Sequence, residues 1–301
     1  MLITTESLTK RYASAVALDA LSVEIPPGVI GLLGPNGAGK STLFKILLGL
    51  IEPTAGRAVV LEREVMGHHE LRTLVGYMPE HDCFPAEVPA ATMITHLAQI
   101  SGLPYAAARE RTSEVMRHVG LLEERYRELG TYSTGMKQRA KLAQALVHDP
   151  PLLLLDEPTN GLDPAGRNEM LELIRRTGHE LGISIVLSSH LLDDVERVCD
   201  YIILIDKGRL VRAGAMSEFT EESQVLIIET DGGEPELAAA LELRSVGAQI
   251  EGSTLLVDLA NEGVYDTTLA TVVELGLPLI RLERRRRSLV DLFTAEEQEV
   301  G

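Results

Sequence analysis

Residues 34–42 read Gly-Pro-Asn-Gly-Ala-Gly-Lys-Ser-Thr and follow directly after the apolar run Val29–Leu33. The spacing G-x-x-x-x-G-K-[ST], placed between a buried strand and a helix, is the pattern of a phosphate-binding loop. Its glycines let the chain curl so that backbone N–H groups face phosphate oxygens, and side chains there would block that approach. A helix that begins near Lys40 adds its positive N-terminal dipole. The stretch therefore predicts a nucleotide site on an α/β fold.

The side chains of this loop have separate predicted roles. Lys40 is expected to reach the β- and γ-phosphates, and Ser41 is expected to bind Mg²⁺. The other residues expected to line the nucleotide site are Asn36, Gly37, Ala38, Gly39 and Thr42.

A second element is the run of four leucines at Leu152–Leu155, followed by Asp156, Glu157 and Pro158. Such a run predicts a strand buried on both faces of a parallel sheet. The carboxyl end of that strand is where open α/β sheets bind ligands. Asp156 is therefore expected in the Mg²⁺ shell, and Glu157 is expected to face the γ-phosphate and polarise an attacking water. Taken alone, these residues are typical of an ordinary polar strand end, and the phosphate-binding loop favours the functional interpretation.

Between these elements lies Tyr132-Ser-Thr-Gly-Met-Lys-Gln-Arg139, and with it the chain resembles the ATP-binding-cassette family. Ser133 is expected to cap a helix that ends before Pro150, and Gly135 to expose a free N–H group. In the family this signature segment closes on the γ-phosphate of ATP held by a partner subunit. The resemblance implies that Ser133 and Gly135 complete the partner's site in a head-to-tail pair. The family usually has a further glycine where this chain has Thr134.

The resemblance covers residues 1 to about 215 and implies roles for more of them. Tyr12, with Val16 in the same pocket, takes the place of an aromatic ring that stacks on adenine. Asp163 belongs to a loop that communicates between the two composite sites. His190 resembles a switch histidine that contacts the γ-phosphate and helps to position water. Without the resemblance, these residues would be an isolated surface tyrosine, a helix cap and an ordinary histidine.

One position departs from the family pattern. Val75–Glu80 aligns with a loop that normally carries glutamine, and this chain has Glu80 there. The carboxylate adds negative charge near three phosphates, which the metal has to offset, so Glu80 is assigned to the metal and sensor shell. In the family the following segment, here about 81–100, forms a groove for a helix of the membrane subunit. The alternative is that its apolar residues are buried inside a small helical subdomain.

Composition favours a subunit of a larger machine in a reducing compartment. No segment approaches the roughly 20 uninterrupted apolar residues of a transmembrane helix, and the first residues predict a strand, not a secretory leader. Cys83 and Cys199 lack metal-like spacing. The net charge is −17, with 22 basic and 27 acidic residues in 1–215 against 6 and 18 in 216–301. This acidic balance argues against a nucleic-acid partner.

The sequence predicts a second domain at 216–301, after a boundary in the small and acidic stretch 214–222. Its pattern gives the β-α-β-β-α-β order of a ferredoxin-like fold. Arg284–Arg287 is read either as solvated charges or as a docking site for an acidic surface or lipid headgroups. A last amphipathic helix is expected to contain Leu289, Leu292 and Phe293. The predicted strands are 225–229, 248–251, 254–259 and 279–283, and the predicted helices are 236–243 and 265–275.

The prediction is an α/β protein with a P-loop NTPase core at 1–215. This core includes an antiparallel β subdomain and a helical subdomain at about 81–150, and a small α+β domain follows it. The tail resembles the C-terminal extension of cassette subunits in bacterial two-component exporters. The resemblance implies an ATPase that uses ATP and Mg²⁺, pairs with a second cassette, and drives an integral membrane permease from the cytoplasmic face of the membrane.

The alternative is a non-transport cassette ATPase, a nucleotide-driven switch or clamp on a soluble partner. DNA clamps of the family carry a long coiled coil and basic surfaces, which this chain lacks. The permease interpretation is therefore favoured, with a homodimer permitted because both half-sites are intact in sequence.

Overall fold

The computed structural model describes residues 1–13, 15–219, 222–252, 254–259 and 263–286. The chain divides into two compact units, Met1–Met216 and Ser217–Gly301. The predicted amphipathic helix with Leu289, Leu292 and Phe293 lies outside the described residues, as does Arg287 of the predicted basic run.

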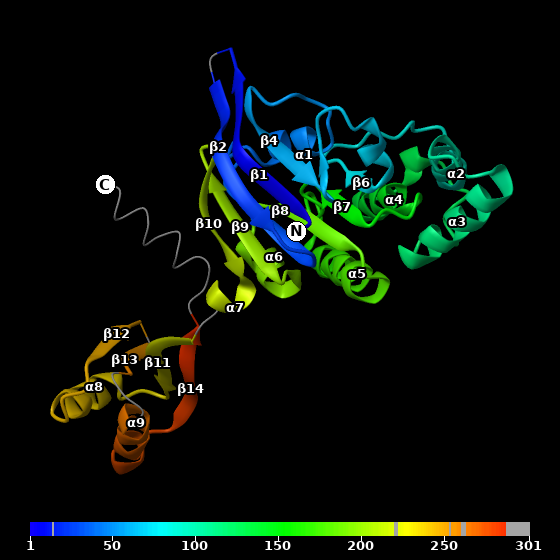
Figure 1. Ribbon diagram of the computed structural model, residues 1–301. Helices are drawn as coiled ribbons and strands as arrows, with labels where there is room; N and C mark the ends of the chain where they lie inside the picture. The colour runs from blue at the N-terminus through cyan, green and yellow to red at the C-terminus, as the bar shows by residue number, and fades with distance from the viewer. Residues whose placement is uncertain (14, 220–221, 253, 260–262, 287–301) are drawn as a thin grey trace. The chain divides into compact units, whose positions relative to one another are not determined.

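A six-stranded sheet forms the centre of the first unit (Figure 1). The strands from β9 to β6 are parallel, and β10 is antiparallel at one edge. Leu152–Leu155 is fully buried, as a strand covered on both faces requires. This confirms the predicted α/β class. In spatial order the strands are β10 (Arg209–Ala215), β9 (Tyr201–Asp206), β3 (Val29–Leu33), β8 (Ser184–Ser189), β7 (Leu152–Leu155) and β6 (Val75–Met78).

Three helices lie against one face of this sheet (Figure 1). Two of them approach so closely that only glycine fits beneath them. A Cβ atom on Gly76 would lie 2.1 Å from the carbonyl oxygen of Ala145, and one on Gly31 would lie 2.2 Å from the Val195 side chain. The helices are α4 (Thr134–Leu146), α5 (Pro164–Leu181) and α6 (Leu192–Val198).

An antiparallel sheet and helix α1 (Lys40–Leu47) cover the other face. Phe44 of α1 is fully buried in one core cluster with Leu8 of the antiparallel sheet and Leu154 of the central sheet. The antiparallel sheet matches the predicted β subdomain and has the strand order β2 (Ala15–Ile25), β1 (Ile3–Tyr12), β4 (Ala55–Val60) and β5 (Arg63–Glu64).

A helical region follows β6 and leads into α4. It contains α2 (Ala90–Ile100) and α3 (Tyr105–His118), followed by a short 3₁₀ turn at Leu129–Thr131, whereas the 3₁₀ turn at His69–Thr73 precedes β6. In the segment 81–100, Ile94 is buried inside the helical region, as the alternative interpretation predicts, while Cys83 and Pro85 are exposed; the groove for a membrane subunit stays a prediction. No helix in the described part of the chain is long and apolar enough to cross a membrane.

The ends of the helices around the site follow from local chemistry. The Ser133 side chain accepts from the Met136 N–H and begins α4, as predicted. Asp163 caps α5, which has Pro at its first position and ends at Gly182 in the left-handed region with φ +66°. These caps fix where the chain turns from strand ends into helices.

The second unit has the predicted ferredoxin-like fold. Its four strands are all antiparallel, and Leu226, Ile228 and Leu255 face a small core shared with α8 and α9. Among the described residues of this unit, the four strands and the two longer helices have the predicted types. The strand order is β12 (Ala248–Glu251), β13 (Thr254–Asp258), β11 (Glu222–Thr230) and β14 (Leu279–Arg286), and the helices are α8 (Glu234–Glu242) and α9 (Gly263–Glu274), after a short α7 (Met216–Phe219).

The buried strand β7 gives a test of the core. Leu154→Ala removes a fully buried side chain and is expected to lower the free energy of unfolding by about 2–5 kcal/mol, because a cavity remains. Leu181→Ala at the half-exposed end of α5 makes the same chemical change and should cost at most about 0.5 kcal/mol. Urea-induced unfolding followed by circular dichroism measures both. Equal losses would contradict the assignment of β7 to the core.

Candidate functional site

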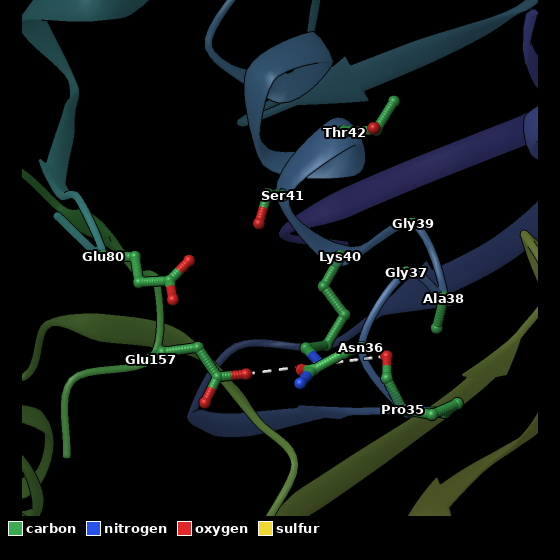
Figure 2. Close-up of a pocket in the computed structure, with 10 residues that line it drawn as sticks. All are labelled: Pro35, Asn36, Gly37, Ala38, Gly39, Lys40, Ser41, Thr42, Glu80 and Glu157. Carbon is green, nitrogen blue, oxygen red and sulfur yellow. Dashed lines mark hydrogen bonds and ion pairs between the residues drawn. The ribbon is translucent and has the colours of Figure 1, made fainter. Parts of the chain in front are cut away.

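One cavity of about 340 Å³ lies at the phosphate-binding loop (Figure 2). Its size is in the range of small-molecule sites. Gly37 and Gly39 have φ of +86° and +108°, which favour glycine, and a Cβ on Gly39 would lie 2.4 Å from the Ala17 carbonyl oxygen. The loop therefore keeps its curled shape only with glycine there. The residues that line the cavity are Pro35, Asn36, Gly37, Ala38, Gly39, Lys40, Ser41, Thr42, Glu80 and Glu157.

Lys40 is buried between the loop and Glu157. Its Nζ donates to the carbonyl oxygens of Gly34 at 2.6 Å and Pro35 at 3.4 Å, and it lies 3.3 Å from Glu157 Oε1. Figure 2 shows the lysine side chain reaching between these groups. The ammonium is thus held by its own loop and by a carboxylate from the end of β7.

Asp156 is a buried carboxylate on which three hydroxyls converge. Ser188 donates to Oδ1 at 2.8 Å, Ser41 donates to Oδ1 at 3.3 Å, and Tyr77 donates to Oδ2 at 3.5 Å. Burial and then the charge of Asp156 raise the pKa of the Tyr77 hydroxyl above its ordinary value, so it stays protonated. These bonds offset the cost of burying the charge.

Glu157 follows with a strained backbone, at φ +48°. Its N–H donates to Ser188 Oγ at 2.9 Å, which fixes the turn. The two carboxylate oxygens of Glu157 have different partners. Oε2 lies 2.8 Å from His190 Nδ1, whereas buried Oε1 has no hydrogen bond and meets only the Lys40 ammonium. Such a carboxylate can accept a proton while its neighbouring histidine orients it.

Glu80 reaches the cavity from the segment after β6. Its Oε1 accepts from Asn160 Nδ2 at 3.2 Å, and its carbonyl oxygen accepts from Lys141 Nζ at 2.7 Å. Lys141 is almost fully buried in α4 and also donates to the Pro79 carbonyl at 3.0 Å. Burial lowers the pKa of its ammonium, and the charge of Asp82 opposes that shift.

Sequence reasoning missed four residues that support the site. Tyr77 and Ser188 hold Asp156, while Lys141 and Gln138 hold the segments around it, since Gln138 Nε2 donates to the Asn160 carbonyl at 2.9 Å. Ser188 had a signal, because it lies two residues before His190 at a strand end. A polar residue within a helix gives no such sign of burial.

Three predicted site residues lie together but do not line the cavity. A Cβ on Gly161 would lie 3.4 Å from Thr134, and one on Gly135 would lie 3.8 Å from Leu162, so the start of α4 adjoins the loop before α5. Ser133 caps the first helix. Asp163 caps the second by accepting from the Gly166 N–H at 2.7 Å.

Tyr12 and Val16 are also not among the residues that line the cavity, although Ala17, next to Val16, lies against Gly39. They belong to the hairpin of β1 and β2, where Val16 pairs with Arg11. Their side chains are 45% and 47% exposed, and the Lys10 ammonium lies 5.3 Å from the centre of the tyrosine ring. An exposed aromatic face of this kind can stack on a planar ligand.

Comparison with known proteins identifies relatives of the whole chain. Residues 18–160 match the family model described as ABC transporter. An uncharacterized ABC transporter ATP-binding protein, YxlF, of Bacillus subtilis (strain 168) is 33% identical over 96% of this chain and 97% of its own length. The Nod factor export ATP-binding protein I of Ralstonia nicotianae is 32% identical over 97% of this chain and 92% of its own.

The solved structures include a similar fold. The structure of cbiO1 from Clostridium perfringens, described as part of the ABC transporter complex cbiONQ, has a TM-score of 0.66 and 30% identity. It covers 72% of this chain, and the match includes 89% of cbiO1. The likeness therefore spans most of cbiO1.

Lys141 gives a test of the supporting contacts. Lys141→Met is expected to lower the free energy of unfolding by about 1–3 kcal/mol, because the Pro79 and Glu80 carbonyls lose a buried donor. Lys137→Met on the same helix removes a more exposed partner of Asp82 and should cost about 0–1 kcal/mol. Urea titrations compare the two variants. A loss for Lys137→Met as large as that for Lys141→Met would refute the role given to the buried lysine.

Proposed function

This chain belongs to the family of ABC transporter ATP-binding proteins, and we propose that its cavity at residues 35–42, Glu80 and Glu157 is the site of ATP binding and hydrolysis. The protein is an ATPase subunit that energises transport. The observation that carries the proposal is that a phosphate-binding loop and a histidine-paired glutamate line one cavity, with a buried aspartate bound to Ser41 of that loop.

Phosphate binding would require Lys40 to exchange partners. Its ammonium now binds the Gly34 and Pro35 carbonyls and Glu157, and the β- and γ-phosphates would replace these groups. The loop N–H groups and the N-terminus of α1 supply the remaining attraction for the anion. Tyr12 would stack on adenine, with Val16 beside it.

The residues present fit a magnesium ion. Ser41 Oγ and Asp156 Oδ1 lie 3.3 Å apart, and Glu80 lines the same cavity, so hard oxygen donors of the kind that Mg²⁺ prefers are concentrated there. Ser41, Asp156 and Glu80 would hold the ion. When bound, Mg²⁺ neutralises the charge on the phosphate oxygens.

Glu157 would act as the base for the attacking water. Once the phosphates draw Lys40 away, Oε1 loses its only cation and is free to accept a proton. His190 on Oε2 would hold the carboxylate in place and contact the γ-phosphate. Lys40, Glu157 and His190 are thus the catalytic group in this proposal.

The position of the signature residues supports a two-chain site. Ser133 and Gly135, with Asp163 nearby, do not line the cavity of their own chain, yet the N-terminus of α4 is a suitable anion-binding end. We propose that they complete the ATP site of a second copy. Closure of the pair on ATP would drive export through a separate membrane permease, with the subunit on the cytoplasmic face. The export name of a close relative supports the direction.

Glu157→Gln tests the base assignment. The change keeps shape and hydrogen bonding but removes the proton acceptor, so kcat for ATP hydrolysis should fall by roughly 10²–10⁴-fold while ATP still binds. Glu172→Gln on the exposed face of α5 is the matched control and should keep wild-type turnover. Steady-state phosphate release and equilibrium ATP binding are the measurements. Rapid hydrolysis by Glu157→Gln would refute the assignment.

Affinity purification tests the partner assignment. Tagged Glu157→Gln, extracted from detergent-solubilised host membranes with ATP, is expected to bring down a multi-span membrane protein, because the ATP-bound state accumulates. The Lys40→Ala variant, which loses the phosphate-binding ammonium, sets the background. Recovery of only soluble proteins, ribosomes or DNA would instead favour a non-transport ATPase.

A further inference from the structure

The second unit presents an edge strand with unusual exposed apolar residues. Within the described residues, β14 pairs with β11 on one side and forms the edge of the sheet on the other. Edge strands normally avoid exposed apolar side chains, because free N–H and C=O groups there invite pairing with another chain. Here Ile280 is 66% exposed and Leu279 is also exposed.

Helix α9 adds apolar surface on the same flank. Its Thr271 and Glu274 contact Arg244, which lies two residues after the end of α8, so this side of α9 faces α8. Leu269 and Val273, one turn apart, lie on the opposite flank, and Val273 is 71% exposed. Since α8 contacts β12 and β13, the flank away from α8 points towards β14.

The charges of β14 favour pairing with a second copy of the same strand. Residues 281–284 pair regularly with β11, and within them Arg281 and Glu283 have opposite signs two positions apart. In the single chain these two side chains bind each other, and Arg281 also lies 3.4 Å from Glu229 Oε1, so pairing with a second copy would add cross-strand partners to an existing pair. Two β14 strands can pair in antiparallel fashion with Leu282 at the two-fold axis. Arg281 of each copy then lies opposite Glu283 of the other copy, which gives two such pairs. Opposite charges that face each other across an antiparallel pair are stabilising.

Neighbouring registers do not place Arg281 opposite Glu283 of the second copy. A shift by one position places Arg281 opposite Arg284, or leaves Arg281 opposite Leu282. A shift by two places Glu283 opposite Glu283, or Arg281 opposite Arg281. Like charges directly opposite each other are destabilising, so the strand fits a second copy of itself in one register.

We propose that the second unit dimerises through β14, so that two four-stranded sheets join into one across a two-fold axis. Ile280 and the α9 residues Leu269 and Val273 would be buried at this junction, where each side uses the same surface. This contact needs no nucleotide. It goes beyond the proposed ATP-driven closure and would keep two chains together between cycles.

Sedimentation velocity of the full chain without nucleotide tests the proposal. Wild type is expected to be dimeric at micromolar concentration, and Ile280→Lys should weaken the dimer at least tenfold, because it places a positive charge opposite Arg284 of the second copy. Ile250→Lys is the matched control, because Ile250 is 46% exposed on β12 at the other edge of the same sheet. It should remain dimeric. A monomeric wild type, or equal weakening by both substitutions, would overturn the proposal.

Charge reversal tests the register. Arg281→Glu and Glu283→Arg should each weaken the dimer, and the double variant should recover most of the loss, because the opposite-sign pairs are restored across the axis. An absence of recovery would overturn the register.

A wild-type monomer that dimerises only after removal of residues 287–301 would show that the chain's own C-terminal segment covers β14, which also overturns the proposal. ATP hydrolysis, measured separately, distinguishes these outcomes from failure of the proposed ATP site.

Discussion

The carboxylate of Asp156 is the interaction on which the site depends. Ionised carboxylates are costly to bury unless hydrogen bonds compensate, and here the donors come from α1, β6 and β8. One buried charge therefore ties the start of the phosphate-binding helix to three neighbouring strands. Ser188 extends the tie, because it also accepts from the Glu157 N–H and so sets the turn that carries this glutamate to Lys40.

Local sequence patterns were sufficient to predict the main elements of the fold. The loop at 34–42, the leucine strand at 152–155 and the ferredoxin-like order of the second unit all follow from periodicity and turn residues within short stretches. The supporting contacts were not predictable in this way. Tyr77 meets Asp156 only because β6 lies next to β7, and the burial of Lys141 depends on how closely α4 approaches the sheet at Gly76.

Around the cavity, negatively charged side chains outnumber positively charged ones. Glu157 and Glu80 line the cavity together with Lys40, and the carboxylate of Asp156 binds Ser41 of the same cavity. A nucleotide alone would add several negative charges to this excess. A cation that arrives with the phosphates would offset this charge, and Glu80, where the family usually has a neutral amide, adds to the charge to be offset.

Two polar side chains of α4 have a mechanical consequence. Lys141 binds the carbonyls of Pro79 and Glu80, and Gln138 binds the carbonyl of Asn160. Sliding the helix past either loop would break buried hydrogen bonds at about 1–3 kcal/mol each. The helix and both loops therefore move as one rigid body. A displacement of Glu80 then also displaces Ser133, at the N-terminal end of α4.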